Sequence, residues 1–570
     1  MFLDGSMIRE KAADEAVVEA LSSQCALPRL KARLLALRGV TPATLERYMN
    51  PSLPDLADPS GLNGVDEAVG SLLAAVRNRR RIVVFGDYDC DGVCATAIMV
   101  NALRALHADV APFVPDRTTE GYGMNEASVA RMLRDNPGVG LVVTVDNGIN
   151  AVEHVAQLKE RGVEVVVTDH HLPGDELPDS IVVNPKVAAP PELEWLCGSG
   201  VAFLLSMALV RAAVACGMYS GPKIGAPLIV LAGLATVTDI MPLVGQNRII
   251  VAEALRRFRE SAPVGLQELS SRAMRSAAAL TARDFGFLIG PRINAAGRVA
   301  SGMEALDLIL ETDRERAREL AMNVDLRNVE RKEVEQKMTD AALSQVVPGA
   351  PAQVIDIPDG HQGVSGIVAA RILERLGPAN AVPVCVIVRS HGSARAPEGY
   401  NVRDAFVASA EALARYGGHA AAGGFSVRDG MTRRFAELFS AACARQAALA
   451  PPGPRGATMV DAVVSGRDMT LELSEWIRLL EPFGEGNPAP LFAMRRQFLS
   501  DVRPVGQDGR HLMVAFCGAA MPRAVWWNRG DMVDALRAAS AVPHDVAFTL
   551  ETSSYGEPHP ELRIVAMSAS

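Results

Sequence analysis

The hydrophobic and polar positions from Arg81 to about Pro185 predict alternating strands and helices. Short β-rich runs, RIVVFG, LVVTV and VEVVVT, alternate with stretches of helical period such as VCATAIMVNALRAL. This alternation is typical of parallel strands joined by crossover helices. In open sheets of this kind, ligands bind outside the carboxyl ends of the strands. We therefore expect an active site at that edge of the sheet.

The region that follows is mainly helical. Apolar runs VAFLLSMALV and APLIVLAGLATV lie within about 198–298, and a highly charged stretch covers about 304–347. Within it, Val334, Met338 and Ala341 repeat at i, i+4 and i+7. This spacing predicts one long amphipathic helix, which we interpret as a connector between domains.

The last third of the chain returns to strand-rich patterns. A second α/β unit is expected over about 351–447, with strands AQVIDI and VPVCVIV and a Gly-rich segment, GGHAAAGG. PPGPRG, after Ala450, reads as a linker by its proline and glycine content. Beyond it, HLMVAF, RAVWW, HDVAFTL and LRIVAM are short and β-prone, which predicts a small antiparallel barrel.

Composition indicates a modular globular protein. A chain of 570 residues suggests about two to four domains of the usual size. Hydrophobic residues make up 49%, which is enough for real cores. The net charge of −9 argues against coating nucleic acid through bulk charge, so any such contact must be local. Aspartates gathered in a metal site are compatible with this charge, because the bound cations supply the positive field.

The N-terminus and the cysteines indicate the cellular compartment of the protein and the redox state of its thiols. No uninterrupted apolar run of about 18 residues is present, and the N-terminus MFLDGSMIREKAADEA carries acids where a signal peptide needs an apolar run. The eight cysteines are scattered without C-x-x-C spacing, so neither a zinc ribbon nor a disulfide framework is supported. A cytoplasmic protein with reduced thiols and no membrane contact is expected.

The strongest chemical signal is VVFGDYDCDGVCATA, where Asp87, Asp89 and Asp91 crowd a strand end before a helix. Carboxylates so close raise each other's pKa unless a cation compensates, and a hard divalent metal does so naturally. DYDCDG also matches the opening of an EF-hand loop, but the twelfth position is Ile98 instead of glutamate, and a strand precedes the loop. The EF-hand reading and a solvated acidic turn are both disfavoured.

Two further strands end in the same way. LVVTV runs into Asp146, and VEVVVT runs into Asp169, His170 and His171. Parallel strands of one sheet bring these ends to one edge. Mixed carboxylate and imidazole ligands suit manganese or magnesium. Isolated histidines such as His107 are more often core or surface residues, whereas adjacent histidines after an acid at a strand end favour metal or phosphate chemistry.

In this order, GDYDCDG, GYGMNE, VTVDNG and TDHH resemble the motif series of the DHH phosphoesterases. The resemblance implies a two-metal phosphodiesterase with two Mn²⁺ or Mg²⁺ ions per active site. It makes metal ligands of Asp89, Asp91, Asp146, His170 and Asp239, with Asp146 bridging both ions. Asp87 and His171 are implied near metal or scissile phosphate as catalytic residues. Where relatives can place a histidine this chain has Phe85, and Asp87 is the candidate to complete that ion's ligands.

The rest of the chain resembles the RecJ branch of the superfamily. GPRINAAGR is similar to a basic RecJ segment, in which Arg292 and Arg298 would contact nucleotide phosphates. GVSGIVAARI, GSARAP and RYGGHAAAGG resemble the DHHA1 companion domain, in which Ser393, Arg395 and His419 would hold the nucleic-acid end. Without the resemblance, the arginine pair could also lie on a solvated loop, and the small-residue segments could also be ordinary packing features.

LEPFGEGNPAPLF resembles the entry to the third RecJ domain, an OB-like barrel that binds single strands by a basic groove and stacking aromatics. Trp526 and Trp527 are candidates, and at most one can stack because adjacent strand residues face opposite sides. For either tryptophan alone, core packing is favoured.

The resemblance implies an α/β fold class with a modular chain. We expect an N-terminal helical segment over 1–60 and a parallel-sheet DHH domain over 61–302. A connector helix over 303–347 would join this to a smaller α/β DHHA1 domain over 348–450, followed by an OB-like β-barrel over 451–570.

The function implied is a 5′-to-3′ exonuclease of single-stranded DNA in DNA repair and recombination, with single-strand-binding protein and helicase as further partners. One alternative is a short-oligonucleotide or cyclic-dinucleotide phosphodiesterase, which the barrel-like segment disfavours. The other is a catalytically inactive replication scaffold. Intact acids and histidines at every motif argue against it, since a scaffold does not need mutually repelling carboxylates.

Overall fold

The computed structural model describes residues 8–117, 119–121, 123–274, 280–449, 457–518, 522–553 and 557–569. Contacts within the chain divide it into two compact units. Unit 1 comprises Met1–Pro51, Pro452–Phe483 and Asn487–Ser570, and unit 2 comprises Ser52–Pro451 with Gly484–Gly486. The linker expected at 451–456 and Tyr122 of the GYGMNE motif lie outside the described residues.

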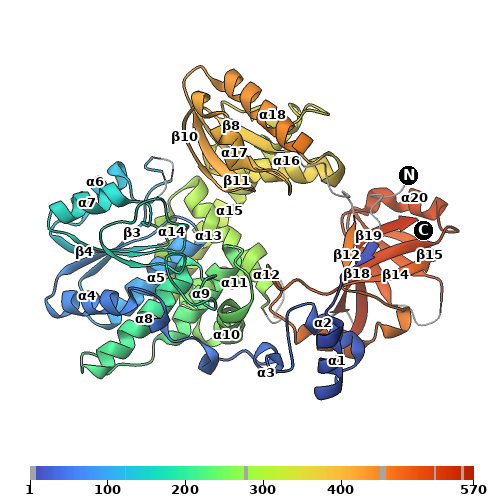
Figure 1. The fold of residues 1–570 in the computed structure, drawn as a ribbon, viewed down its shortest axis with the longest axis horizontal. Coiled ribbons are helices and arrows are strands. Elements are labelled where there is room, and N and C mark those ends of the chain that lie inside the picture. The colour runs from blue at the N-terminus through green and yellow to red at the C-terminus, as the bar shows by residue number, and fades with distance from the viewer. Residues whose placement is uncertain are drawn as a thin grey trace. The chain divides into compact units, whose positions relative to one another are not determined.

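Unit 2 contains the expected parallel sheet (Figure 1). Its order is β3-β2-β4-β5-β6, and every pair is parallel. The strands are β2 (Arg81–Phe85), β3 (Val110–Phe113), β4 (Val139–Val145), β5 (Glu164–Thr168) and β6 (Ile181–Val183). The carboxyl ends of β2, β4 and β5 are therefore neighbours at one edge.

Both faces of this sheet are covered by helices, which explains its nearly continuous apolar strands. Val84 and Val143 pack with one helical layer, whereas their neighbours Val83 and Val142 pack with the other, as the period of two requires. The first layer contains α4 (Val65–Arg77), α5 (Cys90–Ala105) and α8 (Gly198–Ala215), and the second contains α6 (Glu126–Asp135) and α7 (Val152–Glu160).

The helical region predicted after the sheet is present. Helix α8 is long and apolar enough to cross a membrane by length and composition, but 67% of it is buried, where it packs on α4, α5 and α9. That burial is expected of a core helix. The helices that follow are α9 (Gly225–Thr238), α10 (Gly245–Ser261), α11 (Val264–Ala273), α12 (Ala282–Asp284), the π-helical turn η3 (Phe285–Ile289) and α13 (Gly290–Val299).

The single connector helix predicted over 303–347 is wrong in detail, because two helices occupy this stretch. Helix α14 (Gly302–Leu310) ends at Glu311, which has extended backbone, and α15 (Arg314–Leu343) begins after Asp313. The Asp313 carboxylate accepts a hydrogen bond from the Arg316 amide at 2.8 Å. Side-chain capping of this kind starts a new helix and competes with continuation of the old one.

The second α/β unit of the sequence forms a five-stranded sheet in the order β10-β11-β9-β8-β7, in which only β7 and β8 are parallel. Helix α16 (Ser365–Asn380) is interrupted at Gly377, which has φ of 69°. The remaining elements are β7 (Gln353–Asp356), β8 (Val384–Val388), β9 (His391–Arg395), α17 (Val402–Val407), β10 (Leu413–Gly418), β11 (Ala422–Val427) and α18 (Thr432–Leu449).

The beginning of the chain folds with its C-terminal third in unit 1. Strand β1 (Ile8–Glu10) pairs in parallel with β12 (Thr458–Val460). The buried Asp461 carboxylate lies 2.8 Å from Lys11 Nζ and 3.6 Å from an Arg38 guanidinium nitrogen. The first helices are α1 (Glu15–Gln24), α2 (Arg29–Ala36) and α3 (Leu45–Met49).

The C-terminal sheet has seven strands in the order β13-β14-β18-β19-β17-β16-β15. The strand pairing is mainly antiparallel, as expected, but β13 pairs with β14 and β17 with β19 in parallel, which the sequence did not predict. Among the described residues β13 and β15 remain sheet edges, so backbone pairing does not close a barrel. Elements are β13 (Ala462–Val463), α19 (Leu471–Arg478), β14 (Leu491–Gln497), β15 (Leu499–Val505), β16 (His511–Phe516), β17 (Arg523–Trp526), α20 (Val533–Ala538), β18 (His544–Ser553) and β19 (His559–Ala569).

Candidate metal centre

The strand-end acids and histidines predicted from the sequence meet at one edge of the parallel sheet. Asp87 follows β2, Asp146 follows β4, and His170 follows β5 after Asp169. Asp91 lies in the first turn of α5, and Asp239 caps the C-terminal end of α9.

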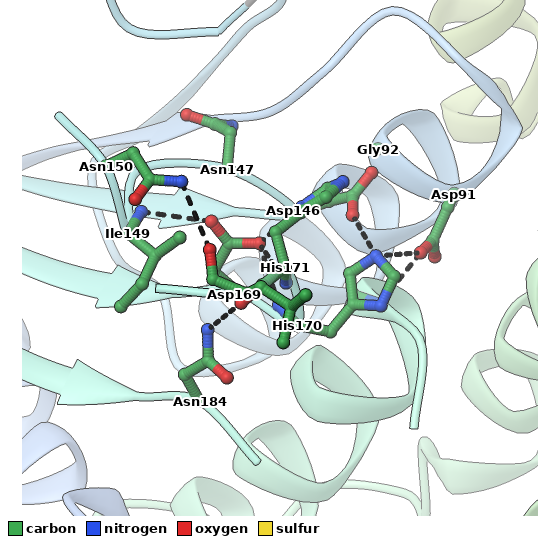
Figure 2. Close-up of polar contacts among 12 residues, drawn as sticks. Asp91, Gly92, Asp146, Asn147, Ile149, Asn150, Asp169, His170, His171 and Asn184 are labelled. Atoms are coloured by element: carbon green, nitrogen blue, oxygen red, sulfur yellow. Dashed lines mark hydrogen bonds and ion pairs between the residues drawn. The ribbon is translucent and has the colours of Figure 1, made fainter. Parts of the chain in front are cut away.

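His170 lies at the centre of this group. Its Nε2 is 3.2 Å from Asp146 Oδ1, 3.7 Å from Asp91 Oδ2 and 3.7 Å from Asp239 Oδ2. Figure 2 shows the imidazole turned toward Asp91 and Asp146. Three carboxylates around one imidazole nitrogen form a donor set of the kind that divalent transition metals accept.

Among the residues that the structure describes, potential ligand atoms form three overlapping groups, within each of which they lie no more than 4.8 Å apart. One group consists of Asp87, Asp89 and Asp146, and a second consists of Asp91, His170 and Asp239. The third joins Asp146 to His170 and His171. Asp146 belongs to the first and third groups and His170 to the second and third, so these two residues link the three groups into one cluster.

Burial and mutual repulsion dominate the electrostatics of these carboxylates. Burial, with repulsion from Asp89, raises the pKa of Asp87 well above its usual range. Burial, with repulsion from Asp91 and Asp89, has the same effect on the pKa of Asp146. For Asp239, burial and the same two neighbours raise the pKa to about 8. These charges would be costly without compensation.

Asp91 is held by the N-terminus of α8. The Gly198 amide donates to Asp91 Oδ2 and the Ser199 amide to Oδ1, both at 2.7 Å. A β-carbon on Gly198 would lie 2.6 Å from the Asp146 side chain, so only glycine allows this approach. The helix terminus favours the ionised form of the carboxylate.

Asp169 serves a different purpose from the other acids. Its Oδ1 lies 2.7 Å from His171 Nδ1, and its Oδ2 accepts the Ile149 amide at 3.0 Å. Burial opposes the charged form of both partners. Their hydrogen bond, their mutual attraction and neighbouring contacts together outweigh burial, so that the pKa of Asp169 is lowered and that of His171 is raised to about 9. Asp169 thus orients His171 and keeps it cationic.

These features fit a site for divalent cations. Asp87 Oδ1 is buried and has no hydrogen-bond donor among the described residues. The pKa values of Asp87, Asp89 and Asp146 are all raised by burial and repulsion. Phe85 is buried and its ring centroid lies 4.8 Å from that of Phe113, so it belongs to the core. Phe85 therefore cannot bind a metal ion, and Asp87 is the candidate ligand that follows strand β2.

A group of cations lies beside the acidic cluster. Burial, followed by repulsion from Arg117, lowers the pKa of Arg298 to about 10, and the same two causes lower the pKa of Arg395. Arg117 also lies over the Tyr88 ring at 5.0 Å, and Arg298 donates to the Gly363 carbonyl at 3.1 Å. Partly buried cations that repel one another favour an anionic ligand.

The other residues predicted to contact nucleic acid are placed differently. Ser393 is close to this group, with its Oγ 2.9 Å from that of Ser365. Arg292 is engaged within the protein, because it pairs with Asp325 at 2.8 Å and donates to the Leu288 carbonyl at 2.7 Å. His419 is exposed between β10 and β11, and among the described residues no contact joins its side chain to Arg395.

Sequence reasoning missed four residues that contribute to the site. Arg117 follows β3, so the strand-end rule could have found it. Gly198 and Ser199 begin a helix, and Asn294 accepts the Cys90 amide at 2.8 Å through its side chain from α13. Signals for these last residues are not local, because their partners are about one hundred to two hundred positions away.

Sheet, helices and strand-end cluster together define an α/β domain of the DHH type. The chain matches the DHH family N-terminal domain over residues 81–222 and the RecJ OB domain over residues 460–565. It is 37% identical to the single-stranded-DNA-specific exonuclease RecJ of Salmonella typhimurium, with 86% of each chain covered. The chain belongs to the RecJ family.

Further relatives agree with this membership. The RecJ of Thermus thermophilus is also 37% identical, and the match covers 83% of this chain and 66% of that relative. A crystal structure of RecJ from Thermus thermophilus in complex with Mn²⁺ matches with a TM-score of 0.84 at 32% identity. That match covers 100% of this chain and 80% of the other.

Proposed function

We propose that this protein is a metal-dependent exonuclease that hydrolyses single-stranded DNA from the 5′ end, acting in DNA repair and recombination. The observation that carries the proposal is the buried cluster of carboxylates around His170 in a member of the RecJ family. Two relatives are named single-stranded-DNA-specific exonucleases, and one was crystallised with Mn²⁺. The 5′ polarity rests on the family resemblance.

Mn²⁺ or Mg²⁺ would be held at two positions. Asp87, Asp89 and Asp146 would hold one ion, and Asp91, His170 and Asp239 the other. Sharing of Asp146 between the two ions rests on the family resemblance. When bound, two such ions lower the pKa of a water between them and neutralise charge on the attacking and leaving oxygens. The α8 N-terminus fixes Asp91 for this role, and Asp146 is fixed by its place at the end of β4.

His171 contributes a proton at a defined atom. Its pKa of about 9 keeps the ring protonated at neutral pH, and Asp169 occupies Nδ1. The remaining N–H, on Nε2, can therefore donate to an oxygen of the scissile phosphate. This accounts for a catalytic function without requiring His171 to bind metal.

The phosphate at the strand end would be held by Arg117, Arg298 and Arg395, with the Ser393 hydroxyl beside them. Their mutual repulsion is relieved when an anion binds between them. His419 remains a candidate for contact with the nucleic acid, because a bound strand could extend to the turn between β10 and β11. The Arg292 contact that the sequence suggested is omitted, because its guanidinium is committed to Asp325.

The C-terminal sheet offers a surface for the rest of the strand. Trp526 is 5% exposed and belongs to the core, whereas Trp527 is 48% exposed. Trp527 lines a cavity of about 500 Å³ with Arg563 and with His511, whose ring centroid is 4.5 Å from that of Trp527. Bases of any sequence can stack on such an aromatic face, and an arginine adds attraction to the strand.

The domain limits, compartment and further partners belong to the same proposal. We assign 61–302 to the DHH domain, 348–450 to a DHHA1 domain and 451–570 to the OB-like domain. Cytoplasmic residence and contacts with single-strand-binding protein and helicase rest on the resemblance. A scaffold without activity is disfavoured, because uncompensated buried carboxylates would only destabilise it.

The test is digestion of end-labelled strands with Mn²⁺. A 5′-labelled single strand should release its label as a short product at once, while a 3′-labelled strand shortens progressively. Duplex DNA of the same sequence should resist. Cleavage confined to oligonucleotides of a few bases or to cyclic dinucleotides would replace the proposal by the alternative phosphodiesterase, and absence of hydrolysis in metal-loaded protein would favour the scaffold.

A further inference from the structure

The loop that follows Asp239 has an unusual backbone. The Ile240 amide donates to Val237 O at 3.2 Å and the Met241 amide to Thr236 O at 3.1 Å, which is the Schellman pattern of a helix end. The residue at the turning position is normally glycine, because φ is positive there. Here it is Ile240, with φ of 57°. A β-branched residue in this conformation is strained.

Ile240 itself does little to stabilise this conformation. Its side chain is 70% exposed, so it gains almost no packing in return for the strain. Strained residues persist only when their surroundings fix them from several sides. The atoms that hold the loop after Asp239 must therefore belong to its neighbours.

Two contacts hold the loop beyond Ile240. On one side, the buried Asn247 side chain donates to the Pro242 carbonyl at 3.1 Å and to the Trp195 carbonyl at 2.6 Å. On the other, the Leu243 amide donates to the Glu485 carbonyl at 2.7 Å. Glu485 belongs to Gly484–Gly486, the three residues from the far end of the chain that are part of unit 2. We call these three residues the anchor segment.

The anchor segment is fitted to the loop so closely that only glycine is accommodated at its ends. A β-carbon on Gly484 would lie 2.7 Å from Leu243 Cδ1, and one on Gly486 would lie 3.1 Å from Pro242 Cβ. Leu243 is 1% exposed and packs against Val251 and Ala282, so it cannot swing away. A larger residue at position 484 must instead displace the loop.

From this geometry we infer that the anchor segment is a positioning element of the metal centre: it holds the loop 240–244 so that Asp239 faces His170. The inference deepens the proposed function and rests on it, since Asp239 matters as a proposed ligand. The anchor acts through Asp239 and touches neither substrate nor metal.

Displacement of the loop 240–244 should weaken the binding of only one of the two proposed ions. Asp239 groups with Asp91 and His170, whereas Asp87 and Asp89 group with Asp146. Loss of groups that orient a ligand typically weakens metal binding by about tenfold to a hundredfold. Displacing the loop should therefore weaken one Mn²⁺ site by about tenfold or more and leave the other unchanged.

The experiment compares full-length Gly484→Val with Gly70→Val. Gly70 is exposed on α4 with no atom near its added β-carbon, so it controls for the new side chain. Mn²⁺ titration by calorimetry should show two sites in the unaltered protein and in Gly70→Val, with one of them weakened in Gly484→Val. Hydrogen exchange without metal should show faster exchange of the Leu243 amide in Gly484→Val alone. Excess Mn²⁺ should restore turnover, as a ligand-positioning defect requires.

A second pair covers the case in which Gly484→Val does not fold. Gly486 and Gly349 both have positive φ, at 68° and 77°, but within the described part of the chain an added β-carbon would meet another residue at Gly486 and none at Gly349. Gly486→Ala should weaken the same Mn²⁺ site, and Gly349→Ala should not. Two intact Mn²⁺ sites despite faster exchange of the Leu243 amide would overturn the inference alone. If the unaltered protein binds no Mn²⁺, the proposed function falls and the inference with it.

Discussion

Replacing Asp146 by asparagine should make the metal-free protein more stable and the metal-loaded protein less stable than the unaltered chain. Asp146 is buried, and burial with repulsion from Asp91 and Asp89 raises its pKa. Asparagine keeps the size of the side chain and removes the charge. It also tolerates the φ of 63° found at this position, which most residues do not.

The magnitudes follow from the burial of the group. Relieving an uncompensated buried polar group is worth about 1–3 kcal/mol. At about 2–4 °C per kcal/mol, the unfolding temperature in chelator should rise by several degrees. Metal at about a hundred times its dissociation constant stabilises a binding protein by about 2.7 kcal/mol. Asp146→Asn should lose most of this gain. The variant should therefore unfold at a higher temperature than the unaltered protein in chelator and at a lower temperature in excess Mn²⁺.

The assay is thermal unfolding in chelator and in excess Mn²⁺, with single-strand hydrolysis measured on the same samples. Turnover should fall by at least about a hundredfold, because a shared ligand supports both ions. Asp307→Asn, on the exposed side of α14, is the matched control and should change stability by less than about 0.5 kcal/mol in either condition. A less stable Asp146→Asn protein in chelator, or one that keeps the full response to Mn²⁺, would refute the reasoning.

Three more predictions concern other parts of the protein. In chelator the unfolding temperature should fall between about pH 4 and pH 8 and then level off: the folded pKa of Asp239, about 8, exceeds its unfolded value of 3.8, so the stabilisation is lost as pH rises from one value to the other. Saturating Mn²⁺ should remove this dependence, and a rise with pH in chelator would contradict it. Arg395→Ala should weaken single-strand binding by about tenfold or more while Mn²⁺ titration stays unchanged; equal DNA affinity would exclude the phosphate contact. Trp527→Ala should impair strands of several dozen bases by about tenfold but spare a tetranucleotide, whereas the buried Trp526→Ala should instead lower the unfolding temperature.

The structure also limits how the C-terminal domain can be tested. A deletion of everything after Ala450 would remove the anchor segment beside Leu243 as well as the Trp527 surface. It would also strip Leu480 from the core that it forms with Leu21 of the first helix. Defects in such a protein would combine strand binding, metal positioning and folding, so single substitutions are the better instrument.

The centre of the site was predictable because one local rule determines it. Strands run into Asp87, Asp146 and Asp169, and parallel pairing brings strand ends together whatever the rest of the chain does. The purpose of Asp169 was not predictable. An acid at a strand end can either face the cluster or turn away to hold a histidine, and only its contacts with His171 and Ile149 distinguish these.

The errors in the fold prediction arise from contacts distant in sequence. Strand β1 pairs with β12 across about 450 positions, and Ile8 alone carries no signal of that partner. The parallel pairing of β17 with β19 likewise depends on how the chain crosses through α20 and β18. The break before α15 differs, because Asp313 is a common helix N-cap and its signal was available in the sequence.

The most direct test of the central claim is the number of metal ions needed for hydrolysis. Mn²⁺ would be titrated into chelator-treated protein, with bound ions counted by electron paramagnetic resonance and single-turnover cleavage of a 5′-labelled strand measured at each point. The account predicts two ions per chain at saturation and cleavage that follows occupancy of the second site. Full cleavage with one bound ion, or with none, would contradict it.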